Sequence, residues 1–176
     1  MADKDKKKNI ILIGMPGVGK STVGVVLAKR CGYRFMDSDL VIQDVHQKLL
    51  HELIAEHGID GFLEIENRIN ASIDTENAVI ATGGSAVYGK DAMKHFAEIG
   101  TIVYLKMPYE GIRRRLGDLA KRGVTLREGQ TLYDLYKERV PLYEKHADVI
   151  VACKGKPIRK IVELVWERVN NLQNSE

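Results

Sequence analysis

A glycine-rich segment that ends in lysine and serine, Gly14-Met-Pro-Gly-Val-Gly19-Lys20-Ser21, directly follows an apolar run at residues 10–13. The spacing is typical of a loop whose backbone N–H groups surround a triphosphate, because glycine allows the close approach and unusual backbone angles that such a loop needs. Lys20 would then reach the β- and γ-phosphates, and the Ser21 hydroxyl would bind Mg²⁺. A helix expected to begin at Ser21 would direct its positive end at the same phosphates. The segment therefore predicts a site for ATP and Mg²⁺.

Two aspartates, Asp37 and Asp39, follow a short extended stretch at residues 34–36. If this segment continues extended, both carboxylates point the same way, because they flank a single residue. One would hold Mg²⁺ through its water shell, and the other would orient or deprotonate an attacking hydroxyl. The alternative is that one of them caps the helix that follows.

Two further groups of residues are candidates for binding the molecule that carries this hydroxyl. The turn Gly83-Gly84-Ser85 follows an apolar run and would let a ligand approach the backbone closely, although it could equally be a simple helix entry with Ser85 as its cap. Arg139 could hold a carboxylate through two hydrogen bonds, or form a surface ion pair.

Strand and helix patterns alternate along the chain, which predicts a three-layer α/β domain with a parallel sheet. Strands are expected at 9–13, 34–36, 77–81, 101–105 and 148–151, and helices at 21–31, 109–116, 131–145 and 158–170. Residues 40–73 have a helical pattern with breaks near Gly58 and Gly61, and they are expected to cover the substrate. Residues 117–129 have no apolar period and are expected to form a mobile loop. The strand ends should bring the candidate residues to one edge of the sheet, where ligands bind in such folds.

Length and composition indicate a single domain, residues 1–176, with 44% hydrophobic and 29% charged residues. Apolar runs are shorter than the roughly 20 residues of a membrane span, and the run after the N-terminal lysines is too short for a signal peptide. The net charge of +3 owes much to those lysines, which have no aromatic residues among them. We therefore expect a cytoplasmic monomer that binds a small anionic molecule and neither nucleic acid nor membrane.

Residues 9 to about 169 resemble the shikimate kinase family. The resemblance rests on the phosphate loop, Asp37-Ser38-Asp39, Phe62-x-x-x-Glu66, Gly83-Gly84, and Glu138-Arg139-Val-Pro-Leu-Tyr143. It implies a nucleoside-monophosphate-kinase-like fold around a five-stranded parallel sheet, with a substrate-binding region at about 40–73 and a lid at about 117–130. It also implies phosphorylation of shikimate by ATP to shikimate 3-phosphate, a step of aromatic amino acid biosynthesis.

The resemblance also implies a role for each matching residue. The catalytic residues would be Lys20, Asp39 and the lid residue Arg122, and Ser21 and Asp37 would hold Mg²⁺. The nucleotide would be bound by Gly14, Gly17, Val18, Gly19, Lys20, Ser21, Thr22, Arg114, Lys156 and Pro157. The acceptor, a small carboxylate that bears a hydroxyl, would be bound by Asp39, Phe62, Glu66, Gly83, Gly84, Ser85 and Arg139.

Two positions depart from the family pattern, and both concern the acceptor. Leu63 stands where the family has an arginine that shares the shikimate carboxylate with the later arginine, and Ser85 replaces a third glycine. Glu66, or alternatively Glu64, would then be free to meet a cationic group, which fits homoserine as an alternative acceptor in threonine biosynthesis. Alternatively, Arg68 or Lys48 replaces the missing arginine and shikimate remains the acceptor. A hypothesis of another class is a non-catalytic module that binds ATP as a switch.

Overall fold

A computed structural model describes residues 9–117, 124 and 126–175. Within these residues, five parallel strands form one sheet in the order β2-β3-β1-β4-β5. The strands are β1 (Asn9–Ile13), β2 (Arg34–Asp37), β3 (Ala78–Ala81), β4 (Gly100–Lys106) and β5 (Val149–Ala152). The helices are α1 (Lys20–Cys31), α2 (Ser38–His46), α3 (Leu50–Ala71), the 3₁₀ turn η1 (Ala86–Tyr88), α4 (Lys90–Ile99), α5 (Tyr109–Leu116), α6 (Leu132–His146) and α7 (Ile158–Gln173).

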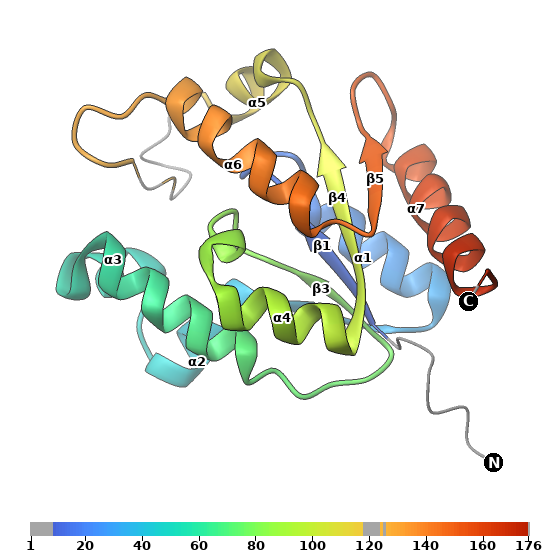
Figure 1. Cartoon of the computed structure of the whole chain (residues 1–176), viewed down its shortest axis with the longest axis horizontal. Helices are drawn as coiled ribbons and strands as arrows, with labels where there is room; N and C mark the ends of the chain where they lie inside the picture. Colours follow the sequence, from blue (N-terminus) through green and yellow to red (C-terminus); the bar gives the residue numbers. More distant parts are fainter. Residues whose placement is uncertain (1–8, 118–123, 125, 176) are drawn as a thin grey trace.

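The helices cover both faces of the sheet, with α1 and α7 on one face and α4 and α6 on the other (Figure 1). This arrangement confirms the predicted three-layer α/β fold. Strand β1 lies between β3 and β4, and Ile10 is in register with Val79 on one side and Thr101 on the other. Every residue of β1 is buried, which explains why residues 10–13 form a continuous apolar run rather than an alternating one.

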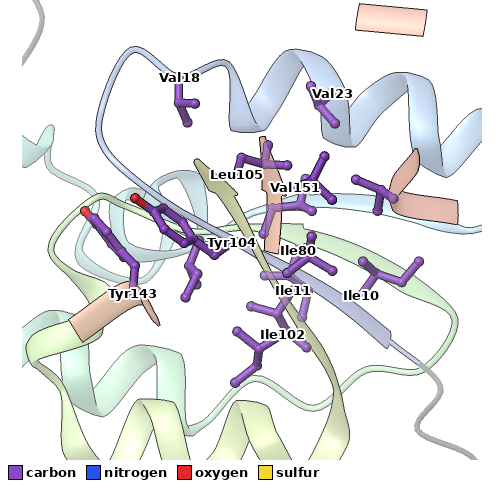
Figure 2. Close-up of a cluster of buried hydrophobic side chains, with 14 of the residues drawn as sticks. Ile10, Ile11, Val18, Val23, Ile80, Ile102, Tyr104, Leu105, Tyr143 and Val151 are labelled. Carbon is purple, nitrogen blue, oxygen red and sulfur yellow. The ribbon is translucent and has the colours of Figure 1, made fainter. Parts of the chain in front are cut away.

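The core combines aliphatic side chains of the strands with side chains of the helices that cover them, and it includes one stacked pair of tyrosines (Figure 2). Tyr104 of β4 stacks on Tyr143 of α6, with ring centroids 5.1 Å apart. The Tyr143 hydroxyl donates a hydrogen bond of 2.6 Å to the carbonyl oxygen of Gly84. Because Arg139 precedes Tyr143 by one helical turn, this contact places Arg139 beside the Gly83-Gly84 turn.

Three sequence-based expectations differ from the structure. Residues 40–73 form α2 and α3, and α3 does have non-helical backbone at Gly58 (φ 70°), but the break expected near Gly61 is absent because Gly61 is helical. Helix α4, which lies between β3 and β4 in the chain and covers one face of the sheet, was not among the expected helices. The segment after β2 is not extended: Asp39 lies in the first turn of α2.

Part of the predicted lid, residues 118–123 and 125 with Arg122 among them, lies outside the described residues. None of the helices in the described ranges is long and apolar enough to span a membrane.

Candidate active site

The phosphate loop connects β1 to α1, and its backbone requires glycine at several positions. Gly17 and Gly19 have positive φ angles of 81° and 102°. A Cβ atom on Gly14 would lie 2.8 Å from the carbonyl oxygen of Leu105. The Lys20 ammonium donates to the carbonyl oxygens of Gly14, at 2.7 Å, and Met15, at 3.0 Å. The side chain of Lys20 is thus held over the loop that would surround the phosphates.

Burial lowers the pKa of Lys20 to about 8, and the positive charge of Arg139 acts in the same direction. The carboxylates of Asp39, Asp37 and Glu66 oppose this shift. The lysine therefore belongs to a cluster in which charges of both signs lie close together in a largely buried site.

Ser21 and Asp37 are adjacent and provide oxygen atoms suited to a divalent cation. The Ser21 hydroxyl donates to Asp37 Oδ2 at 2.8 Å. Asp37 Oδ1 accepts a hydrogen bond of 3.0 Å from the backbone N–H of Asp39, so Asp37 also caps α2. A hydroxyl and a carboxylate beside a phosphate loop are the hard oxygen ligands that Mg²⁺ prefers, and the pair fits this ion. Asp37 therefore does cap α2, and this role does not exclude binding of Mg²⁺.

A cavity of about 460 Å³, here called the phosphate cavity, opens above the loops that follow β1, β2 and β3. Its lining residues are Pro16, Gly17, Gly19, Lys20, Ser21, Thr22, Asp37, Asp39, Thr82, Gly83, Gly84 and Arg115. Gly14 and Val18, also predicted to bind nucleotide, are buried residues of the loop and do not line this cavity.

Arg115 is a residue that the sequence analysis missed. It lines the phosphate cavity and donates to the carbonyl oxygen of Val18 at 2.9 Å. Arg114 is also exposed but does not line the cavity. Helical spacing could have indicated this residue. Arg115 lies three residues after the buried Ile112 and so is on the side of α5 that faces the rest of the protein. Lys156 and Pro157 lie between β5 and α7 and do not line the phosphate cavity either.

A second cavity of about 100 Å³, the acceptor cavity, shares Pro16, Asp39, Gly83 and Gly84 with the first. It is also lined by Leu50, Ile54, Phe62, Glu66, Ser85, Val124 and Arg139. The structure therefore gathers at one site the predicted acceptor residues Asp39, Phe62, Glu66, Gly83, Gly84, Ser85 and Arg139. Asp39 lies where the two cavities meet.

Asp39 is suited to accept a proton near neutral pH. Burial raises the pKa of its carboxyl group to about 6, and the negative charge of Asp37 acts in the same direction. Lys20 opposes the shift but does not cancel it. A carboxylate with this pKa, placed between a phosphate site and an acceptor cavity, can take the proton of an attacking hydroxyl.

Glu66 is a second buried carboxyl group in the acceptor cavity, with only 2% of its surface exposed. Its Oε2 atom accepts a hydrogen bond of 2.6 Å from the Ser85 hydroxyl, while Oε1 has no hydrogen-bond partner among the described residues. Burial raises the pKa of Glu66 to about 7; the bond from Ser85 opposes this shift, whereas the charge of Asp39 adds to it.

Arg139 supplies the buried positive charge of the acceptor cavity, with 5% of its surface exposed. Its Nε atom donates to the Tyr88 hydroxyl at 3.3 Å, and its guanidinium carbon lies 5.4 Å from the centre of the Tyr88 ring. Tyr88 in turn donates to the carboxylate of Glu138. Tyr88 was not predicted from the sequence, because a lone tyrosine after a glycine turn carries no distinguishing pattern.

The model of the shikimate kinase family matches residues 16–170 of the chain. The chain belongs to the shikimate kinase family. It is 35% identical to a shikimate kinase of Clostridium botulinum (strain Eklund 17B / Type B) over 157 residues, which cover 89% of this chain and 93% of the relative. It is 36% identical to a shikimate kinase of Nostoc punctiforme over 168 residues, 93% of this chain and 92% of that one.

Solved structures of shikimate kinases are also similar to this chain. The enzyme from Acinetobacter baumannii in complex with shikimate is 29% identical, with a TM-score of 0.84 and coverage of 93% of both chains. The enzyme from Aquifex aeolicus is 28% identical, with a TM-score of 0.80, and the match covers 92% of this chain and 96% of that one. A gluconokinase from Sinorhizobium meliloti, 17% identical with a TM-score of 0.58, shares the fold alone. As a member of the shikimate kinase family, the protein is an ATP-dependent kinase.

Leu63 distinguishes the site from the family pattern described above. It lines a third cavity of about 100 Å³, the rim cavity, which shares Phe62, Ser85 and Arg139 with the acceptor cavity. The other residues of the rim cavity are Ile59, Tyr88, Arg127, Gln130, Leu135 and Glu138. Lys48 pairs with Glu56 instead, and Arg68 is exposed on α3; neither lines the acceptor cavity or the rim cavity.

Proposed function

We propose that the protein transfers the γ-phosphoryl group of ATP to a hydroxyl of shikimate, giving shikimate 3-phosphate and ADP. The observation that carries this proposal is the continuity of the phosphate cavity with the acceptor cavity at Asp39. Arg139 supports the choice of a carboxylate as acceptor, because it is the buried cation of the second cavity. The family match supports shikimate in particular.

On the nucleotide side, Lys20 would leave its carbonyl partners to contact the β- and γ-phosphates, and the loop N–H groups would surround them. Ser21 and Asp37 would hold Mg²⁺, which neutralises charge on the phosphate oxygens. We assign Arg115, in place of Arg114, to the nucleotide side because it lines the phosphate cavity. The role of Arg122 as a lid residue over the phosphates stays a prediction, as do those of Lys156 and Pro157.

On the acceptor side, Asp39 would accept the hydroxyl proton while the hydroxyl oxygen forms a bond to the γ-phosphorus. The bond from this phosphorus to the bridging oxygen breaks, and ADP leaves with the electron pair. Arg139 would bind the acceptor carboxylate, and Phe62 would pack against the carbon skeleton. Gly83 and Gly84 would let the acceptor contact the backbone of this turn directly, since a side chain at either position would fill the space beside Asp39 or Arg139.

Homoserine is a second candidate acceptor, and Glu66 is the observation that favours it. Its Oε1 atom is buried and unpaired, and Leu63 provides no guanidinium nearby to satisfy it. The amine of homoserine would lie against Glu66, its carboxylate against Arg139, and its hydroxyl against Asp39. Shikimate has no cationic group to place at Glu66.

Product identification tests the proposal. The purified protein is incubated with Mg-ATP and separately with shikimate, homoserine and gluconate, and ADP release is followed together with mass detection of the phosphorylated product. We expect phosphoshikimate. ATP hydrolysis that is independent of any acceptor, without a phosphorylated product, would instead support a non-catalytic ATP-dependent binding module.

We further propose that the protein acts as a cytoplasmic monomer, without nucleic acid or a membrane as partner. Both cysteines, Cys31 and Cys153, are free, which is typical of proteins in a reducing compartment and supports the cytoplasm. Size-exclusion chromatography with light scattering measures the mass in solution, and a mass of two or more 19.8 kDa chains would contradict the monomer.

A further inference from the structure

The rim cavity extends the acceptor site on the side away from the phosphate loop. It meets the acceptor cavity at Phe62, Ser85 and Arg139, of which Arg139 is the charged member. A second guanidinium group, that of Arg127, also lines the rim cavity. An anionic group bound by Arg139 can therefore lie within the space that Arg127 faces.

An ion pair with Asp60 fixes the guanidinium group of Arg127 beside α3. Arg127 Nη2 lies 2.5 Å from Asp60 Oδ1, and Nη1 donates to Oδ2 at 3.4 Å. Asp60 and Leu63 are three residues apart on α3 and so share a face of this helix. The guanidinium thus lies one helical turn from Leu63, whose own side chain brings no charge to the cavity.

The backbone of Arg127 is also tied to α6. Its N–H donates to Gln130 Oε1 at 3.2 Å, and Gln130 Nε2 donates to Glu138 Oε2 at 3.2 Å. Glu138 directly precedes Arg139, so this chain of contacts connects the two arginines. Arg127 retains N–H donors beyond those that face Asp60, because a guanidinium carries five. Its side chain is 52% exposed, which leaves those donors accessible to a ligand.

We propose that Arg127 is an acceptor-binding residue, which together with Arg139 holds the anionic group of the acceptor at the end opposite the reacting hydroxyl. This inference rests on the proposed function in one respect, that the acceptor carries a carboxylate. Two guanidinium groups on one carboxylate provide both charge and directional hydrogen bonds. In this chain the second group comes from the segment before α6, while the neighbouring position on α3 is the apolar Leu63.

The Arg127→Gln variant tests the assignment through steady-state kinetics with shikimate and with its uncharged methyl ester. Loss of a hydrogen bond to a charged group is expected to raise the KM for shikimate by about tenfold or more, while the KM for ATP stays within about twofold. The same substitution should change the KM for the ester by less than about threefold, because the ester has no carboxylate charge to lose. Arg127→Lys, which keeps the charge, should recover part of the loss.

Two control variants separate binding from structure. Arg68→Gln removes an exposed arginine of α3 that lines neither the acceptor cavity nor the rim cavity, and its KM for shikimate should match the unmodified protein. Asp60→Asn breaks the ion pair but leaves the guanidinium, so it should raise the KM for shikimate clearly less than Arg127→Gln does.

Equal effects of Asp60→Asn and Arg127→Gln would overturn the proposal, because the ion pair would then be purely structural. An unchanged KM for shikimate in Arg127→Gln, or a rise confined to the KM for ATP, would overturn it as well. Failure of the proposed function is visible beforehand, as absent turnover of shikimate by the unmodified protein. If homoserine is turned over instead, the KM values of the same variants are measured with homoserine and its methyl ester. The same differences in KM then support or overturn the role of Arg127.

Discussion

Replacement of Glu66 by glutamine is expected to stabilise the fold, and to do so more at high pH than at low pH. The side chain is 2% exposed, and burial raises its pKa from 4.5 to about 7. The folded state therefore holds this proton more tightly than the unfolded state does. The free energy of unfolding must fall as the pH rises from about 4.5 to about 7, and above this range the full penalty is present.

The size of the effect follows from the shift. At 1.36 kcal/mol per pKa unit, the penalty is about 3 kcal/mol at pH 8 and about 1 kcal/mol at pH 5. Glutamine has nearly the same shape, can still accept the hydrogen bond from Ser85, and carries no charge to desolvate. The Glu66→Gln variant should therefore gain about 2 kcal/mol more at pH 8 than at pH 5, relative to the unmodified protein.

Urea unfolding at pH 5 and pH 8 measures this difference directly. Glu64→Gln is the matched control, because Glu64 is an exposed carboxylate two residues away on α3 and its replacement should have little effect at either pH. An equal change at both pH values, or a loss of stability at pH 8, would refute the reasoning that Glu66 is a desolvated carboxyl group.

Three further predictions concern catalysis. Lys20→Ala and Asp39→Asn should each abolish phosphorylation of the acceptor in the coupled ADP assay, and retained turnover would contradict their assigned roles. Because Asp39 has a pKa of about 6 and acts as its anion, kcat/KM should fall below about pH 6 with a slope of one. This decrease should persist in Glu66→Gln, whereas a flat profile between pH 5 and pH 7 would exclude Asp39 as the base. Gly83→Ala should lower kcat/KM by about tenfold or more, because its Cβ would lie 2.6 Å from Glu66 Oε1 and 2.8 Å from Asp39 Oδ1. Steady-state kinetics measure the loss of activity, and circular dichroism checks that the variant stays folded. Unchanged kinetics would show that the turn can move aside.

The strongest sequence signals were those in which one local pattern determines one local structure. The apolar run before Gly14 is a central strand, and the loop after it holds Lys20 over its own carbonyls. The ends of β2 and β3 also bring Asp39 and Gly83 to one site, as parallel topology predicts.

Other features depend on contacts that local patterns do not specify. The position of Asp39 was expected on extended backbone, yet Asp37 caps α2 and places Asp39 inside a helical turn. The role of Arg127 depends on Asp60, which lies 67 residues away in the sequence, so no local pattern indicates the pair. Likewise, Tyr88 is identified as a partner of Arg139 only when η1 and α6 are seen to pack together.

A competition experiment between shikimate and homoserine determines which acceptor the protein prefers. The protein is given Mg-ATP with equal concentrations of shikimate and homoserine, and the two phosphorylated products are quantified by mass over time, which gives the ratio of the two kcat/KM values. We expect phosphoshikimate to dominate. Phosphohomoserine without phosphoshikimate would contradict this account and would mean that Glu66, rather than Arg139 alone, selects the acceptor.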